Sequence, residues 1–259
     1  MTDPTRQIAD AVLYEGHMLY PYRPSALKNR QRWTFGGVYP PAYALATGDR
    51  SRVSFEALVE GEAPRVEIEV RFLQIVSGAV ADEAVERTAG VGTIESPPAR
   101  VEARTERLRD GVHRLSASIE NTSAWSGSDR AEAMRHTLAS AHVVARVAGG
   151  AFVSPRDTGE PLRHEGLWPV LVGEPGDRST LLASPIILDD YPRVAPESPG
   201  DFFDGGEIDQ LLVLGILALS DEEKAEVRAG DPRARAILER TEAMAPEDLA
   251  RLHGTWRNP

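Results

Sequence analysis

The residues most suited to recognition chemistry are aromatic and basic side chains near the start of the chain. Nearly half of the aromatic residues fall between Ile8 and Tyr43. The stretch from Pro21 to Trp33 holds four basic residues and no acidic one, although the chain as a whole is acidic. Tyrosine, tryptophan and arginine are enriched at the energetic centres of protein–protein interfaces. We therefore predict a partner-binding segment with the residues Tyr20, Tyr22, Arg23, Lys28, Arg30, Arg32 and Trp33.

The same residue types allow two other interpretations of this segment. Arginine can hold a phosphate or a carboxylate through paired N–H donors, so the segment could bind a small anionic ligand. Alternatively, the aromatic rings fill the edge of the core and the aliphatic stems of the arginines cover them. The sequence leaves all three interpretations open.

A second concentration of charge lies between Asp189 and Asp209, where seven carboxylates are opposed by Arg193 alone. Carboxylates can bind Ca²⁺ or Mg²⁺, but this spacing is not that of an EF-hand loop, and we predict no metal site. The segment is otherwise a solvated linker that ends in a helix cap, or an acidic surface that docks a basic partner. For the docking interpretation, the surface residues are Asp189, Asp190, Asp201 and Asp204.

The histidines form no recognisable catalytic or metal-binding pattern. The six of them include no His-x-x-x-His and no His-Glu-x-x-His spacing. Gly-x-Ser-x-Gly and the P-loop are also missing, and Glu95 stands where a dinucleotide fingerprint beginning at Gly90 needs its last glycine. We predict no cofactor. Because catalytic groups also assemble from distant positions, a hydrolase-like enzyme with a dispersed His/carboxylate pocket stays the alternative function.

Alternating apolar residues predict β-hairpins in the first half of the chain. Residues 53–59 and 66–72 alternate on either side of a Gly/Pro-containing link and suggest one hairpin. Residues 101–108 and 112–119 flank Asp110-Gly111, a pair that favours a tight turn because glycine tolerates positive φ.

Three later apolar runs also have the composition of strands, and a short helix lies before them. The runs are residues 138–153, 167–172 and 180–188, and Ser128 is expected to cap the helix. Short links favour antiparallel pairing. We therefore predict an α+β fold with a mainly antiparallel β-sandwich or curved sheet and a C-terminal helical region packed on it.

The last quarter of the chain has the signals of helices. Ser220 to Glu223 matches a capping box, and Asp231-Pro232 places a cap residue before a proline at the first helical position. Residues 208–219 are apolar almost all round, so we expect this helix to be central and buried. The predicted domains are a β-rich part over residues 1–200, including the aromatic and basic segment, and a helical part over 201–259 docked on it as one unit.

Composition narrows the class of protein. The 259 residues are 41% hydrophobic, which is enough to build a core. No cysteine is present, so disulfides, thiolate zinc sites and cysteine nucleophiles are excluded. The formal net charge of −11 argues against nucleic-acid binding. No apolar run is long enough to span a membrane and the first residues do not form a secretory signal, so we expect a cytoplasmic protein.

Three stretches have a recognisable likeness to a known group: LYPYRPSALKNRQRWTFGGVYP (Leu19–Pro40), SPIILDDYPRVAPESPGDFFDGGEIDQLL (Ser184–Leu212) and DEEKAEVRAGDPRARAILERTEAM (Asp221–Met244). They resemble uncharacterised proteins encoded beside the structural genes of actinobacterial-type nickel–iron hydrogenases. The resemblance implies an accessory, assembly or partner role, with hydrogenase subunits or maturation factors as partners, and transfers no catalytic residue. The lack of cysteine fits a scaffold or chaperone better than nickel insertion or electron transfer. We therefore expect a non-enzymatic protein that binds a partner.

Overall fold

The chain divides into two compact units in the computed structural model, which describes residues 4–15, 21–23, 25–26, 29, 35–78, 82–193, 202, 209–249 and 252. Unit 1 consists of residues 1–13, 35–76 and 84–193, and unit 2 consists of residues 14–34, 77–83 and 194–259. This division differs from the predicted one at residue 200, because two segments from the first third of the chain group with the C-terminal helices. The docking of the two parts as one unit stays a prediction.

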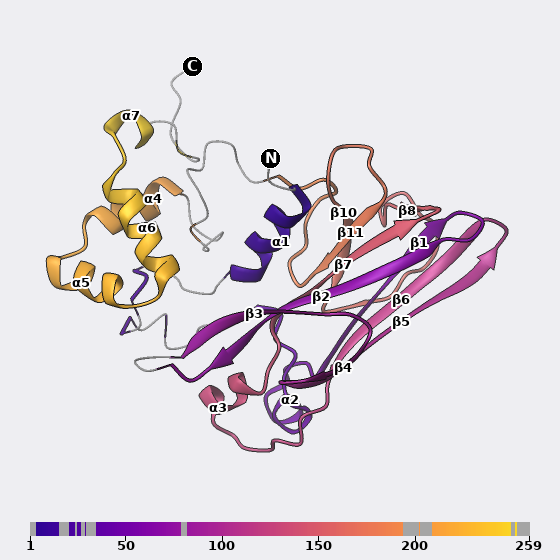
Figure 1. The fold of residues 1–259 in the computed structure, drawn as a ribbon, viewed down its shortest axis with the longest axis horizontal. Helices are drawn as coiled ribbons and strands as arrows, with labels where there is room; N and C mark the ends of the chain where they lie inside the picture. Colours follow the sequence, from indigo (N-terminus) through magenta and orange to yellow (C-terminus); the bar gives the residue numbers. More distant parts are fainter. Residues whose placement is uncertain are drawn as a thin grey trace. The chain divides into compact units, whose positions relative to one another are not determined.

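Unit 1 is built on two antiparallel sheets (Figure 1). The strands of the first sheet, in spatial order, are β4 (Gly92–Glu95), β5 (Pro98–Arg109), β6 (Val112–Asn121), β1 (Arg52–Glu60) and β8 (Ala151–Val153), with β9 (His164–Glu165) paired to β1. The strands of the second sheet, in spatial order, are β10 (Trp168–Leu171), β11 (Thr180–Ser184), β7 (Ala139–Ala148), β2 (Arg65–Val76) and β3 (Glu83–Ala89). Together with the C-terminal helices, the two sheets confirm the predicted α+β class.

The core of unit 1 follows from the period-two alternation of its strands. Phe55 and Val59 of β1, Ile119 of β6 and Phe72 of β2 all belong to one buried cluster to which both sheets contribute. Successive side chains of a strand point to opposite faces, so each sheet supplies every second residue to the space between them. The alternating apolar residues of the sequence therefore form the inner faces of a two-sheet sandwich.

One of the two predicted hairpins is present and the other is wrong. β5 and β6 pair directly around Asp110-Gly111, and Gly111 has the positive φ of 68° that such a turn needs. β1 and β2 do not pair, since β1 pairs with β6, β8 and β9 while β2 pairs with β7. Their link carries the chain from one sheet to the other, and alternation alone cannot distinguish such a corner from a hairpin.

A second corner explains why the predicted strand at 138–153 is two strands. The chain leaves β7 at Gly149-Gly150 and enters β8 in the other sheet. The two corners touch: a Cβ on Gly61 would lie 2.6 Å from the Gly149 carbonyl oxygen, and a Cβ on Gly150 would lie 2.4 Å from the Glu60 carbonyl oxygen. Glycine at these positions lets the two backbones approach each other without a clash.

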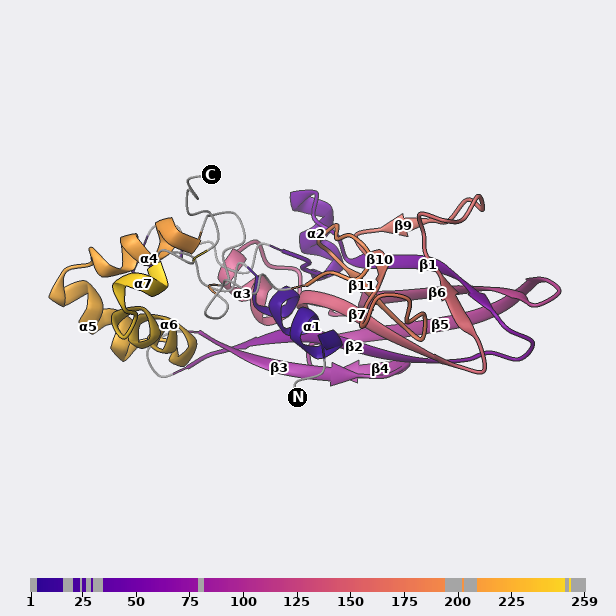
Figure 2. The ribbon, with the colours of Figure 1, turned by 90° about the horizontal axis from the view of Figure 1, so that it is seen from above.

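Three short helices complete unit 1: α1 (Pro4–Tyr14, through Leu13), α2 (Pro41–Thr47) and α3 (Arg130–Arg135). α1 lies beside β2 and β7 of the second sheet (Figure 2). Its apolar face is buried, and Asp10 accepts a hydrogen bond from Arg71 of β2 at 2.5 Å. α3 begins one residue later than predicted, because the side chain of Asp129 caps it by accepting from the Glu132 amide at 2.9 Å. The prediction that Ser128 is the cap is therefore wrong.

Unit 2 contains the four C-terminal helices α4 (Asp209–Leu217), α5 (Asp221–Ala229), α6 (Pro232–Glu242) and α7 (Pro246–Leu249). The predicted capping box is present at Ser220 and Glu223, and Asp231 caps α6 ahead of its proline. Apolar residues of α4, α5 and α6 share a small buried cluster with Tyr22, Phe202 and Leu252. None of the helices described is both long and apolar enough to cross a bilayer.

A buried asparagine joins the segments at one end of the sandwich. Asn121, at the end of β6, is fully buried, and its amide nitrogen donates to the carbonyl oxygens of Val38 at 2.9 Å and His136 at 2.7 Å. Its side-chain oxygen accepts from the Ser123 amide at 2.9 Å. One side chain thus binds three backbone groups and links β6 to the segments at Val38 and His136.

Replacing this side chain is expected to be costly. Asn121→Ala removes hydrogen bonds from the His136 carbonyl and the Ser123 amide, while the Val38 carbonyl keeps its bond from the Leu138 amide at 3.2 Å, and the variant should lower the free energy of unfolding by about 2 kcal/mol. Urea denaturation followed by circular dichroism measures the loss. Glu120→Ala, at the exposed neighbouring position, is the matched control and should change stability by less than about 0.5 kcal/mol. Equal effects from the two variants would contradict the role assigned to Asn121.

Candidate functional site

Two of the seven predicted partner-binding residues are described, and both make contacts inside unit 2. Tyr22 is 2% exposed, and its hydroxyl donates to the Phe202 carbonyl oxygen at 2.8 Å. Arg23 lies 2.7 Å from Glu223 and 3.6 Å from Glu226 of α5. These contacts join Tyr22 to Phe202 and Arg23 to α5. Partner binding by the segment stays a prediction, and the remaining residues, Tyr20, Lys28, Arg30, Arg32 and Trp33, lie outside the described residues.

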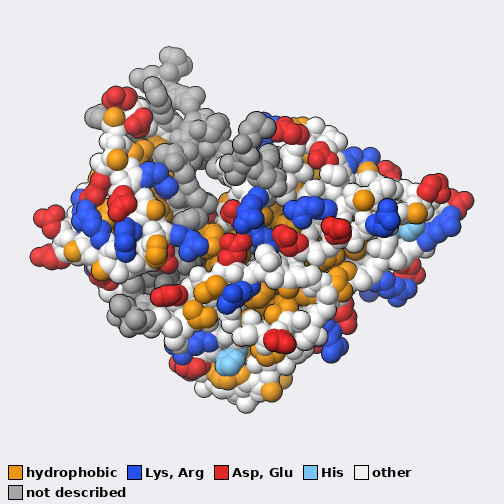
Figure 3. Space-filling view, in the orientation of Figure 1, with side chains coloured by type: hydrophobic (Ala, Val, Ile, Leu, Met, Phe, Trp, Pro, Cys, Tyr) orange, Lys and Arg blue, Asp and Glu red, His pale blue; other side chains and the backbone are white. Residues whose placement is uncertain are grey.

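The acidic residues predicted as a surface are likewise partly engaged within unit 1. Asp190 accepts hydrogen bonds from the Ser154 hydroxyl at 2.5 Å and from the Leu171 amide at 2.8 Å. Asp189 forms an ion pair with Arg156. The other two predicted residues, Asp201 and Asp204, lie outside the described residues. The face of the molecule in Figure 3 has acidic and basic side chains interspersed.

No histidine lines the depression over Ser54 and Ser118 or the one beside Glu67 and Arg146. Among the described residues, no three His, Asp or Glu side chains are placed to share a metal ion. The nearest approach to the alternative enzymatic site is the surroundings of His142, where a histidine and two carboxylates lie near one arginine.

His142 of β7 lies opposite Arg71 of β2 in the sheet and is fully buried. Its Nδ1 is 2.9 Å from the Ser140 carbonyl oxygen, and its Nε2 has no hydrogen-bond partner among the residues that the structure describes. Arg71 is 3% exposed and donates to Asp10 and Glu86, each at 2.5 Å. The cluster is an ion-pair network beneath α1. His142 is fully buried and lines neither of these depressions.

Burial makes His142 a neutral side chain. It lowers the pKa of His142 from 6.5 to about 4, and the neighbouring Arg71 guanidinium acts in the same direction. The hydrogen bond to Ser140 and the carboxylate of Glu86 oppose this shift but do not cancel it. At neutral pH the ring is therefore uncharged, which suits a group packed against a buried cation.

Among the described residues of unit 2, the large apolar side chains that are exposed lie on one face of α4. Leu211, Leu214 and Leu217 are 55%, 49% and 38% exposed, whereas Leu212, Val213 and Ile216 lie in the buried cluster. The expectation of a central helix buried on all sides is therefore wrong. A helix in a small unit of short helices has too few neighbours to cover every side, and the leucines three residues apart are left facing solvent. We call these three residues the leucine face.

Carboxylates stand at both ends of the leucine face. Asp209 is the first residue of α4, and Asp221 and Glu222 begin the next helix with exposed side chains. An exposed apolar patch bounded by charge is typical of an interaction surface. The sequence displays all of these residues, but the uniform apolarity of the helix concealed which side would be covered.

No protein-family model matches the chain, and no curated protein matches its sequence. The function is therefore argued from the geometry of the chain itself.

The buried histidine makes stability depend on pH. In the unfolded chain His142 takes up a proton below about pH 6.5, whereas in the folded chain it does so only near pH 4. The unfolded state therefore binds more protons in this window, and the free energy of unfolding should fall by up to about 3 kcal/mol as pH drops from 6.5 to 4.

Denaturation of the protein and of His142→Gln between pH 7 and pH 4 tests this expectation. The variant should lose part of the acid sensitivity, whatever its stability at pH 7. His136→Gln, at a ring that is only partly buried, serves as the control. An unchanged pH slope in His142→Gln would show that another group carries the acid sensitivity.

Proposed function

We propose that this chain is a non-enzymatic accessory or assembly protein that binds a protein partner through the leucine face of α4. The observation that carries the proposal is the exposure of Leu211, Leu214 and Leu217 on a helix whose other side is buried. Covering such side chains removes apolar surface from water, which favours association. The burial of Leu212, Val213 and Ile216 on the opposite side holds α4 with its leucine face outward.

The charges around the leucine face indicate the kind of partner. A second copy of the chain is a poor occupant, because a two-fold pairing of α4 with itself brings carboxylates together. In an antiparallel pair Asp209 would meet Asp221 and Glu222 of the other copy, and in a parallel pair each would meet itself. Like charges across an interface are unfavourable. A segment with apolar residues flanked by lysine or arginine fits both features.

The resemblance to proteins encoded beside nickel–iron hydrogenases supplies the first partners to test. Within this proposal the chain acts in the cytoplasm on hydrogenase subunits or their maturation factors. Its lack of cysteine agrees with a role in holding or assembling a partner. The aromatic and basic segment would then provide a second contact. Because it is basic whereas the ends of the leucine face are acidic, it would bind a different, acidic part of the partner.

Co-expression of the tagged full chain with hydrogenase subunits tests the proposal. We expect a subunit or maturation factor to be retained, and Leu214→Asp to weaken retention at least about tenfold, because a carboxylate would be buried in the apolar contact. Leu45→Asp is the matched control, since Leu45 is an exposed leucine of unit 1 at 89%. If Leu214→Asp retains the partner as well as the unmodified protein does, the leucine face is not part of the interface. No retention even after crosslinking would refute the hydrogenase role.

The aromatic and basic segment needs a separate variant. Arg23→Glu is unsuitable, because it would set a carboxylate against Glu223 and Glu226 and disturb unit 2. Arg30→Glu combined with Arg32→Glu leaves that contact in place. We expect the pair to weaken partner retention about tenfold with unchanged thermal unfolding. Full retention by this double variant would exclude the segment from the interface.

A further inference from the structure

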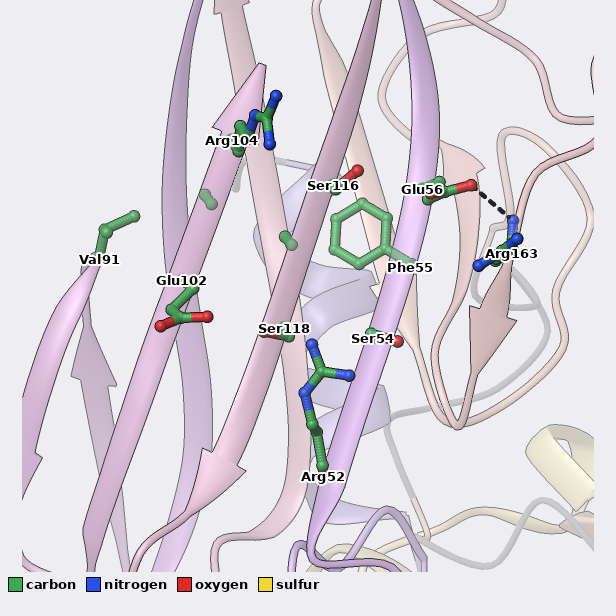
Figure 4. A pocket seen from close by; sticks show the side chains of 12 residues that line it. Arg52, Ser54, Phe55, Glu56, Val91, Glu102, Arg104, Ser116, Ser118 and Arg163 are labelled. Atoms are coloured by element: carbon green, nitrogen blue, oxygen red, sulfur yellow. Dashed lines mark hydrogen bonds between the residues drawn. The ribbon is translucent and has the colours of Figure 1, made fainter. Parts of the chain in front are cut away.

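The outer face of the first sheet has a depression of about 590 Å³ (Figure 4). Ala117 and Ile119 of β6 point into the core, so Ser116 and Ser118 point outward. Ser118 lies between Glu102 of β5 and Ser54 of β1 in the register. The serine side chains are short and the charged side chains around them are long, so the middle of this face lies deeper than its edges. The depression therefore has a floor of hydroxyl groups.

These hydroxyl groups have no hydrogen-bond partner among the described residues. Ser118 is only 7% exposed although it faces outward, which places it at the bottom of the depression. The side chains of Ser54, Ser116 and Ser118 make no hydrogen bond to any other residue that the structure describes. A hydroxyl group that has no partner in the protein can donate a hydrogen bond to a ligand and accept one from it.

Two arginines at the depression are also without a carboxylate partner. Within the described ranges, neither Arg52 nor Arg163 has a carboxylate oxygen within ion-pairing distance of its guanidinium. Arg104, which lines the same depression, is 3.4 Å from Glu106. The guanidinium of Arg52 lies beside Ser54 and Ser118 (Figure 4). Planar N–H donors next to hydroxyl donors form a binding arrangement for an oxyanion.

Carboxylates in the lining limit what the anion can be. Glu56 and Glu102 both face the depression, and Glu56 accepts a hydrogen bond from the Arg163 amide at 2.9 Å. They repel a ligand that is negatively charged throughout. They also accept hydrogen bonds from neutral hydroxyl groups. The lining therefore suits a molecule with one anionic end and several hydroxyl groups.

We propose that this depression binds a small hydroxyl-bearing anion of the sugar phosphate class. Its anionic group lies at Arg52 over the serine floor, and its hydroxyl groups reach Glu56 and Glu102. The site belongs entirely to unit 1 and shares no residue with the leucine face. It is thus independent of the partner-binding proposal.

Isothermal titration of the full chain with glucose 6-phosphate tests this inference. We expect binding in the millimolar range or tighter, weakened at least about tenfold in Arg52→Ser. Arg107→Ser is the matched control, because Arg107 lies on β5 in the same sheet, pairs with Asp110 at 2.5 Å and does not line the depression. Circular dichroism of each variant checks that it is folded.

The possible outcomes separate the site from general charge attraction. Equal weakening by Arg52→Ser and Arg107→Ser would overturn the proposal, as would the absence of binding at about 10 mM probe. Inorganic phosphate binding as tightly as glucose 6-phosphate would overturn the role of the hydroxyl groups. Leu214→Asp should bind glucose 6-phosphate as tightly as the unmodified protein. The titration therefore tests the depression even if the leucine face binds no partner.

Discussion

Most of unit 1 depends on the pairing of β1 with β6, whose register runs without interruption from Arg52 opposite Glu120 to Glu60 opposite Val112. An uninterrupted register fixes the facing of every side chain along both strands, since a slip of one residue would reverse them all. The same constraint sends Phe55 and Ile119 into the core and leaves Ser54 and Ser118 outside. The hydrophobic core and the hydroxyl floor are therefore two results of one pairing.

The sequence was sufficient for the parts of the fold that local patterns determine. Antiparallel strands, the turn at Asp110-Gly111 and the caps at Ser220 and Asp231 each follow from a few neighbouring residues. Which strands β1 and β2 pair with was not predictable in this way. The same alternation occurs in two strands paired with each other and in two strands that face each other across a core. The close approach of Gly61 to Gly149 distinguishes the two arrangements, and only three dimensions reveal it.

The candidate sites were less predictable than the fold. Tyr22 and Arg23 have the residue types of an interface, yet they serve the inside of unit 2, because burial depends on neighbours distant in sequence. The leucine face was overlooked for a related reason: a helix apolar on every side does not indicate which side its neighbours will cover. The serine floor carries no motif, since its members come from different strands and meet only through register.

The division into units has a consequence for the order in which the chain can mature on the ribosome. The last segment of unit 1 ends at Arg193, so every strand of the sandwich is available before the C-terminal helices have been synthesised. Tyr22 is synthesised 180 residues before its partner Phe202, and Arg23 is likewise synthesised well before its partners Glu223 and Glu226. The Tyr22 and Arg23 side chains therefore lack these contacts while the sandwich strands are being synthesised, and a ribosome-associated chaperone can reach them during that interval.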